Sequence, residues 1–173
     1  MLMLFTLVHV MISLVGIASG FVVLAGMLSA KRLDRWTAVF LVTTVATSVT
    51  GFMFPFVHFL PSHAVGLLSL IVLAPVIFAG YRRGMAGLWR PVYVIGSVLA
   101  LYLNVFVLVV QSFLKVPALK AIAPTQSEPP FQMTQLVVLA IFVALAVAAV
   151  LKFRVEKLPL VDRGRLRTGQ LAR

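Results

Sequence analysis

The stretch MLMLFTLVHVMISLVGIASGFVVLAGMLSAKRLDRW (residues 1–36) decides the fold of this chain. Residues 1–30 contain no Lys, Arg, Asp or Glu, and a basic cluster follows at once in residues 31–35. About 20 apolar residues are enough to cross the roughly 30 Å of hydrocarbon in a bilayer. The stretch therefore predicts a retained membrane-spanning helix. A signal peptide would have a shorter apolar run and a basic start.

The rest of the chain repeats this alternation of apolar runs and basic loops. Its 173 residues are 62% hydrophobic and 11% charged, whereas about a quarter of a soluble protein is charged. The uncharged stretch 36–81 is too long for one helix, and Pro61 interrupts it, so we expect a tight helical hairpin there. The composition predicts an all-α, polytopic transmembrane bundle in residues 1–151, followed by a basic tail in residues 152–173. The expected spans are residues 3–29, 36–59, 63–80, 91–114 and 131–151.

The basic loops also predict the orientation of the bundle. Residues 31–35, 82–90 and 152–173 carry thirteen of the fifteen Lys and Arg residues, and short cytoplasmic loops retain such residues. We therefore expect five spans in a bacterial cytoplasmic membrane, with the N-terminus outside and the C-terminus inside. The tail should rest on anionic headgroups and not on nucleic acid, because no aromatic residues are interleaved with its charges after Phe153. The aromatic residues expected at the same inner boundary are Trp36, Tyr81, Trp89 and Tyr93.

Small and polar residues inside the spans predict how the helices pack. Small residues at helical spacing allow neighbouring backbones to approach closely. Ser97, Asn104 and Gln111 recur every seven residues, so they share one face, which must meet another helix or line a ligand site. The loop 115–130 contains four prolines and several apolar residues, and we expect it to form an ordered cap. The small-residue faces are Gly16 and Gly20; Thr43, Thr47 and Gly51; and Ala140, Ala144 and Ala148.

Motifs for catalysis are missing from the sequence. It has no phosphate-binding glycine loop, no His-Glu-x-x-His and no Gly-x-Ser-x-Gly. It also has no cysteine, and the predicted spans contain no Asp, Glu, Lys or Arg, which disfavours an ion-driven transporter. These features favour a protein that is not an enzyme.

The histidines are the remaining candidates for chemistry. His9, His58 and His63 all fall at the predicted outer end of the bundle. Imidazoles from two helices could ligate one haem b axially, or they could hold a copper or zinc ion. Asn104 and Gln111 would then hydrogen-bond the ligating side chains and orient them toward the haem or metal.

Four segments carry a resemblance to a known group of proteins. Together they resemble a family of small bacterial inner-membrane proteins of unknown function, over most of residues 5–135. The positions of His9 and His63 are also similar to those in helical haem proteins of the cytochrome b561 type, which implies a haem-binding bundle. This chain lacks the second, inner pair of histidines of that type. The segments are Trp36-Thr37-Ala38, residues 47–55 (TSVTGFMFP), residues 61–66 (PSHAVG) and residues 100–106 (ALYLNVF).

These observations lead to three hypotheses for the function. The leading one is a non-catalytic accessory or scaffold component whose small-residue faces pack against a membrane-protein partner or a second copy. The second is a redox or metal-handling protein with one haem or metal site near the outer leaflet. The third is a passive channel or carrier for a small solute, lined by the hydroxyls of residues 43–50 and the amides of residues 104 and 111.

Overall fold

The computed structural model describes residues 1–54 and 61–153 of the chain, with only the backbone described for residues 61 and 62. All regular secondary structure in these two ranges is helical, as the composition predicts. The elements are α1 (Leu2–Leu28), α2 (Asp34–Gly51), α3 (Pro61–Ile77), the π-helix η1 (Phe78–Arg82), α4 (Trp89–Lys115), α5 (Pro117–Ile122) and α6 (Pro129–Lys152).

Four of these helices are long and apolar enough to cross a membrane, judged by length and composition. They are α1, α3 with η1, α4 and α6. The remaining long helix, α2, begins with Asp34 and Arg35 and carries five Thr and Ser side chains in its second half, which lower its mean hydropathy. It ends at Gly51, earlier than the expected span limit at residue 59, and residues 55–60 lie outside the described ranges.

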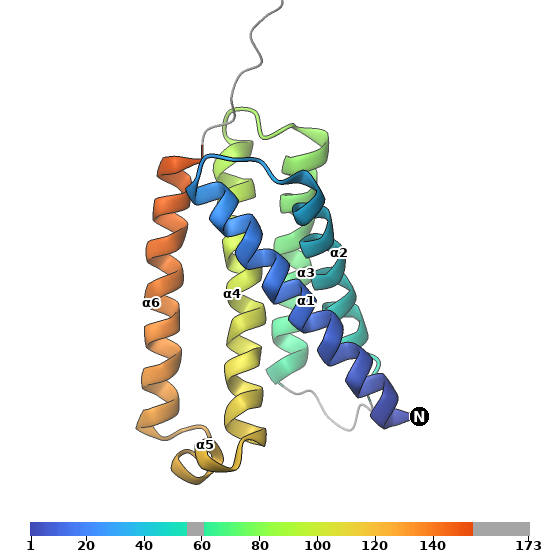
Figure 1. The fold of residues 1–173 in the computed structure, drawn as a ribbon, viewed down its shortest axis with the longest axis vertical. Helices are drawn as coiled ribbons and strands as arrows, with labels where there is room; N and C mark the ends of the chain where they lie inside the picture. Colours follow the sequence, from blue (N-terminus) through green and yellow to red (C-terminus); the bar gives the residue numbers. More distant parts are fainter. Residues whose placement is uncertain (55–60, 154–173) are drawn as a thin grey trace, which may run out of the picture.

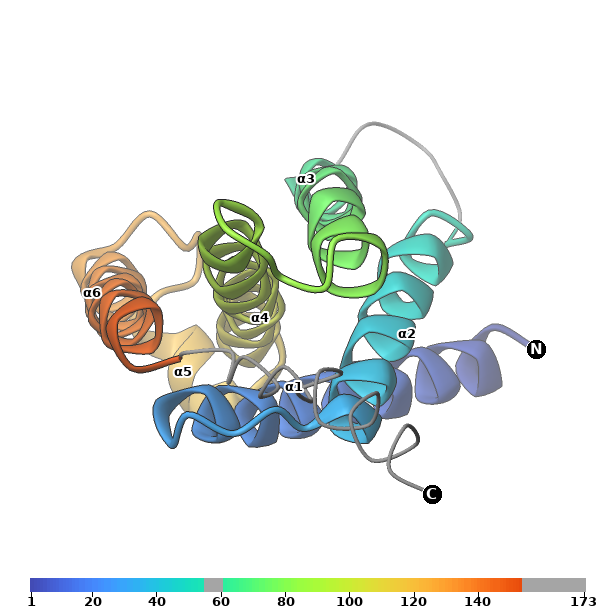
Figure 2. The same ribbon diagram turned by 90° about the horizontal axis from the view of Figure 1, so that it is seen from above.

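The helices form a bundle around α4 (Figure 1). Following the chain, α1 packs on α2, α2 on α3 and α3 on α4, and α1 closes the ring by crossing α4. Seen from above, α6 lies outside this ring, beside α4 (Figure 2). In the most apolar window of each helix, 44% of the residues of α4 are buried but only 11% of those of α6. We conclude that α4 is the central helix and α6 is peripheral.

Glycine allows α1 to approach its neighbours closely. A Cβ atom built on Gly16 would lie 3.1 Å from Thr43 Oγ1 of α2. At Gly20, a Cβ would lie 2.6 Å from Leu101 Cδ1 of α4 and 2.9 Å from Phe40 Cε2 of α2. These separations are shorter than real carbon contacts, so only glycine fits Gly20 without movement of its neighbours. The expected packing role of the Gly16 and Gly20 face is therefore confirmed.

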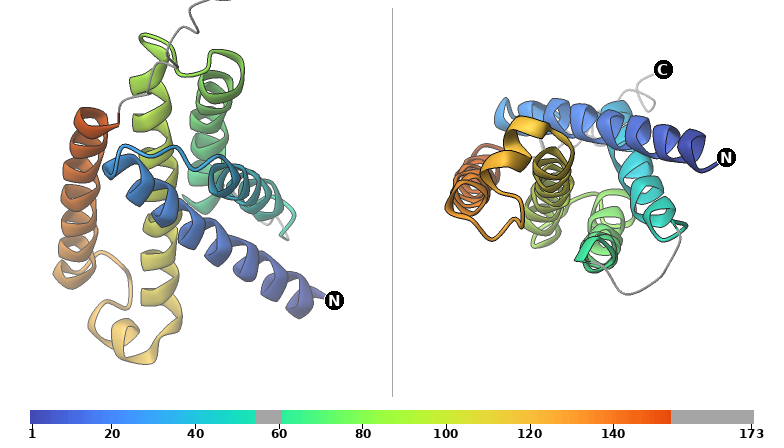
Figure 3. Two further views of the ribbon diagram at one scale, coloured as in Figure 1. Left: turned by 45° about the horizontal axis from the view of Figure 1, so that its top comes forward. Right: turned by 90° about the horizontal axis from the view of Figure 1, so that it is seen from below.

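All the basic loops of the described chain gather at one end of the bundle, which we call the basic end. It contains the end of α1, the start of α2, the end of η1, the start of α4 and the end of α6 (Figure 1). The opposite end, which we call the histidine end, contains His9 of α1 and His63 of α3. Here α1 diverges from α4 and α6 (Figure 3), whereas the end of α2 stays against α3, where Phe52 stacks on His63.

The loop that joins α4 to α6 is ordered, as its composition predicts. It contains the short helix α5 and a turn in which Thr125 and Ser127 bind the Glu128 carboxylate. The α6 helix then follows directly from its N-cap residue Glu128. Two of the three residues of the expected small-residue face of α6, Ala140 and Ala144, are exposed and Ala148 is half-buried, so most of this face does not pack within the described chain.

Candidate functional site

His9 lies in the third turn of α1 and points toward the end of α2. Its Nδ1 atom is 2.7 Å from Thr50 Oγ1, and the Thr50 hydroxyl is also 2.7 Å from the Ala46 carbonyl. A hydroxyl has one proton and a carbonyl can only accept, so with the Thr50 proton on the Ala46 carbonyl, Nδ1 of His9 is the donor to Thr50. In the neutral ring this tautomer leaves the lone pair on Nε2. This bond resembles the one that a metal-ligating histidine usually makes, in which the ring N–H that does not face the metal donates to an acceptor and fixes the ring.

His63 opens α3 and is more deeply buried, with 4% of its surface exposed. Its ring stacks on Phe52, with 5.8 Å between the ring centroids. The His9 ring instead meets the edge of Phe54 at 5.1 Å. The two histidines thus share one end of the bundle, but each packs on a different phenylalanine. His58 lies outside the described residues.

A metal or haem site at this end stays a prediction. Among the residues that the structure describes, no group of three or more His, Asp or Glu side chains is placed to hold a metal ion. A site that uses His9 or His63 therefore needs a further ligand from elsewhere. A Soret band or bound metal in purified protein, lost in both His9→Ala and His63→Ala, would identify such a site.

Asn104 lies in the middle of α4 and is almost fully buried, as the seven-residue spacing predicts. Its Nδ2 atom donates to Thr44 Oγ1 of α2 at 3.1 Å, across the interior of the ring of helices. The Ser48 hydroxyl, one turn beyond Thr44, donates to the Thr44 carbonyl at 2.9 Å. Asn104 therefore ties two helices together and hydrogen-bonds a hydroxyl rather than an imidazole.

Gln111, further along the same face of α4, is half-buried. Two other glutamines bind the backbone of α4 near it: Gln126 Nε2 donates to the Val110 carbonyl at 2.8 Å, and Gln135 Nε2 donates to the Phe106 carbonyl at 3.3 Å. The sequence gives no signal for these bonds, because a glutamine near a helix end does not show which carbonyl it will reach.

The basic end holds a second set of polar contacts between helices. Tyr93 of α4 and Thr37 of α2 lie with their hydroxyls 3.3 Å apart, close to the ion pair of Arg32 and Asp34. These four side chains line a small hollow with about 20 Å³ of space for water, enough for about one molecule. The sequence predicts Tyr93 as a boundary aromatic residue but gives no signal for its partner Thr37 on α2.

Arg90 also joins two helices at the basic end. Its guanidinium Nη1 donates to the Val150 carbonyl at 3.1 Å and to the Phe153 carbonyl. The last carbonyls of a helix have no partner within that helix and carry partial negative charge. Arg90, from the first turn of α4, therefore caps the C-terminal end of α6.

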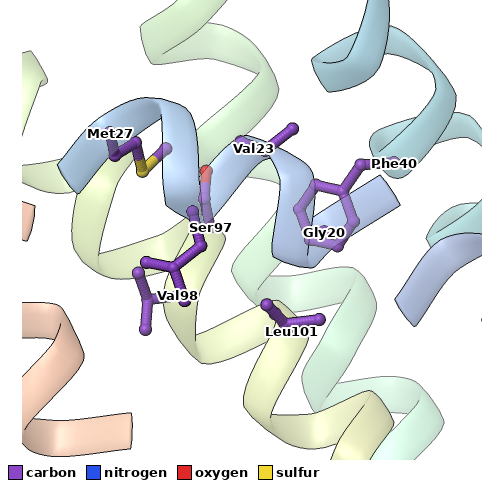
Figure 4. A pocket seen from close by; sticks show the side chains of 8 residues that line it. Gly20, Val23, Met27, Phe40, Ser97, Val98 and Leu101 are labelled. Atoms are coloured by element: carbon purple, nitrogen blue, oxygen red, sulfur yellow. The ribbon is translucent and has the colours of Figure 1, made fainter. Parts of the chain in front are cut away.

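A second hollow lies between α1, α2 and α4, and Figure 4 shows it from close by. Its walls are apolar apart from Ser97, and it has no room for a water molecule. The Ser97 hydroxyl is buried and has no hydrogen-bond partner. Neither this hollow nor the one beside Tyr93 is a water-filled path past Asn104 and Thr47, which a channel would require.

The class of protein that the fold defines is an all-α bundle with four candidate membrane-spanning helices. A comparison of the chain with protein-family models, with curated proteins and with solved structures finds no match in any of the three. The resemblance to a small inner-membrane family and to cytochrome b561-type proteins remains a prediction from the sequence. The function must therefore be inferred from the geometry of this chain.

Proposed function

We propose that this chain is a non-catalytic component of the bacterial cytoplasmic membrane, an accessory or scaffold subunit that docks on another membrane helix through α6. The observation that carries the proposal is the outward face of α6. Ala140 and Ala144 are exposed on it, while Phe142 and Ala149 on the far side of the helix are buried. At 100° per residue, Ala140 lies almost opposite Ala149. A small-residue face that points away from its own bundle lets another helix approach closely.

The other small-residue faces support this choice because they are already occupied. Gly16 meets Thr43, and Gly20 meets Phe40 and Leu101 within the chain. The face of Ala140 and Ala144 is left to a partner or to a second copy. The buried amide of Asn104 is engaged with a hydroxyl of α2.

The proposal includes five membrane crossings, with the N-terminus outside and the C-terminus inside. Two observations support it. The basic loops gather at one end of the bundle, as short cytoplasmic loops do (Figure 1). In addition, α2 packs along α1 and α3, and its 18 residues extend about 27 Å, close to the hydrocarbon thickness. Cysteine labelling at Ser29 and Thr125 of the full chain in intact cells tests it: only Thr125 should react from outside.

Site-specific photo-crosslinking in native membranes tests the docking face. A crosslinking residue at Ala144 should give one defined protein adduct, whose mass distinguishes a second 18.9 kDa chain from a different partner. The matched control is Leu139, which is 41% exposed but lies about 140° away from Ala144 around the helix. It should give lipid adducts. Lipid adducts alone from both positions would overturn the proposal.

A size substitution gives an independent test of the same face. With the crosslinking residue moved to Ala140 on the same face, Ala144→Phe should reduce recovery of the crosslinked partner about tenfold, equivalent to about 1.4 kcal/mol of lost packing. Leu139→Phe should leave recovery unchanged. Both side chains are exposed, so neither change should alter folding. Equal recovery for the two variants would show that the alanine face is covered by lipid only.

A further inference from the structure

Beyond the docking role of α6, the basic end presents a turn with uncompensated positive charge. This turn joins η1 to α4 and is defined here as the arginine turn, residues 81–89. Arg82 and Arg83 are both exposed in it. The salt bridge found within residues 1–54 and 61–153 joins Arg32 to Asp34. Neither Arg82 nor Arg83 therefore pairs with an acidic side chain in these ranges.

Arg83 is held in place although it is exposed. Its guanidinium carbon lies 5.5 Å from the centroid of the Phe78 ring and 5.6 Å from that of the Trp89 ring. The two rings meet edge to face at 5.0 Å and form a corner for the cation. An aromatic ring holds the cation by its face and offers no carboxylate or carbonyl acceptor, so these contacts do not compete with phosphate for the guanidinium N–H groups.

The backbone of the turn is fixed by two further contacts. The Arg83 N–H donates to the Phe78 carbonyl at 3.1 Å, which extends the π-helical bonding by one residue. The Met85 N–H donates to the Ala79 carbonyl at 2.9 Å, and the Met85 side chain is buried with 3% of its surface exposed. Arg83 is therefore presented from a rigid turn, and it loses little freedom when it binds an anion.

Apolar side chains beside the arginines indicate which anion fits. Leu88 is 84% exposed, and Tyr81 is 61% exposed. A soluble phosphate would leave both side chains in water. A phospholipid would place its phosphate on the arginines and its acyl chains on Leu88, and an aromatic side chain such as Tyr81 prefers this interfacial level.

We propose that the arginine turn is a binding site for an anionic phospholipid, whose phosphate is held by Arg83 with Arg82 beside it. The site lies in the folded bundle and is distinct from the basic tail. It depends only on the membrane location of the basic end. It fixes the depth of α4 and of η1 relative to the headgroups of that leaflet.

Quenching of Trp89 fluorescence by brominated lipid tests this site. The full chain carries two tryptophans, so the Trp36→Phe background leaves Trp89 as the reporter. The protein is reconstituted in phosphatidylcholine vesicles that contain brominated phosphatidylglycerol or brominated phosphatidylcholine in equal amounts. We expect about fivefold preferential quenching by the anionic lipid, since one basic residue near the surface contributes about 1 kcal/mol.

Two charge-matched variants separate a site from general attraction. Arg83→Gln should remove most of the preference, whereas Arg35→Gln, which removes an exposed charge from the same end of the bundle, should retain it. Equal loss in both variants, or equal quenching by the two lipids in the unmodified turn, would overturn the proposal. So would loss of the preference on addition of inorganic phosphate, which would identify a soluble anion as the ligand. If Arg83→Gln alters the size-exclusion profile and so the fold, the proposal is tested by the parent protein alone: equal quenching of Trp89 by the two brominated lipids would overturn it.

Discussion

The basic end and the histidine end of this bundle are built from the same five long helices, yet they pack differently. In α1, the seven buried residues all lie between Gly16 and Met27, and none of residues 1–15 is buried. In α6, the buried residues Phe142 and Ala149 both lie in the half nearer the basic end. At the histidine end, α1 diverges from α4 and α6 (Figure 3).

The distribution of small residues explains this difference. Lipid tails are as apolar as leucine, so helices in a bilayer associate through close packing and polar contacts rather than through the removal of apolar surface from water. The glycines of α1 all lie in its second half, whereas residues 1–15 contain no Gly or Ala. Polar contacts do not follow this division, because Arg90 and Tyr93 make them at the basic end, and His9 and Gln135 make them between helices nearer the histidine end. The bundle closes where backbones can approach.

The largest effect should come from filling the closest approach at the basic half. Gly20→Val should destabilise the protein by about 3 kcal/mol, because its Cβ would overlap Leu101 and Phe40. Gly51→Ala at the histidine end, where the nearest atom is 3.9 Å away, should cost well under about 1 kcal/mol. Denaturant unfolding in mild detergent measures both. Similar losses for the two variants would contradict the difference between the ends.

A pair of phenylalanine truncations should give the next largest contrast. Phe40, 1% exposed, fills the core, and Phe40→Ala should cost about 2 kcal/mol for a cavity of about 100 Å³. Phe52 lies at the histidine end and is 38% exposed, so Phe52→Ala should reduce the free energy of unfolding by less than half as much. Thermal unfolding of the two variants measures the ratio. A larger loss at Phe52 would place essential packing at the histidine end.

A smaller effect is expected from the hydrogen bond between α4 and α2 in the middle of the bundle, which joins Asn104 to Thr44. Thr44→Val and Asn104→Leu should show a coupling energy of about 0.6 kcal/mol in a double-mutant cycle, the average for hydrogen bonds within membrane bundles. Steric trapping in bicelles gives the three changes in unfolding free energy that the cycle needs, those of the two single variants and of the double variant. A coupling energy near zero would mean that Asn104 stabilises the bundle by its volume alone.

The smallest effect should appear at the histidine-end cap on acidification. Although slight desolvation opposes the change, hydrogen bonds from Thr125 and from the Ser127 N–H lower the pKa of Glu128 from its usual value of 4.5. A carboxylate with a lowered pKa stabilises the folded cap above its unfolded pKa, and this stabilisation is lost as the pH falls through the folded pKa. The protection factors against amide exchange in residues 125–128 should therefore fall below about pH 4.5. Glu128→Gln should show low protection at every pH, and an unchanged pH dependence in that variant would exclude this carboxylate as the cause.

Much of the architecture is predictable from the sequence. The alternation of apolar runs and basic loops gives the helices α1, α3 with η1, α4 and α6 to within two residues of their expected limits. The exception is α2, which ends at Gly51 because hydroxyl-rich turns and glycine weaken the helix there, whereas hydropathy alone continues to residue 59. The spacing of Ser97, Asn104 and Gln111 also predicts the inward face of α4, which the burial of Ser97 and Asn104 confirms.

The partners of the polar residues are not predictable in the same way. Nothing in the spacing of Asn104 indicates Thr44, and nothing in His9 indicates Thr50, since each contact joins residues more than 40 positions apart. The sequence predicts a common outer level for the histidines, and both His9 and His63 lie at the histidine end. Their separation onto Phe54 and Phe52 depends on how far α1 leans from α3.

The sequence by itself determined that this chain forms apolar helices with its basic loops at one end. Hydrophobicity and charge act on each segment separately, so they can be evaluated one residue at a time. Only the tertiary structure decided that α4 is central, that the alanine face of α6 is left open and that Arg83 sits in an aromatic corner. These features depend on crossing angles and side-chain contacts between helices, and such contacts arise only when distant segments pack together.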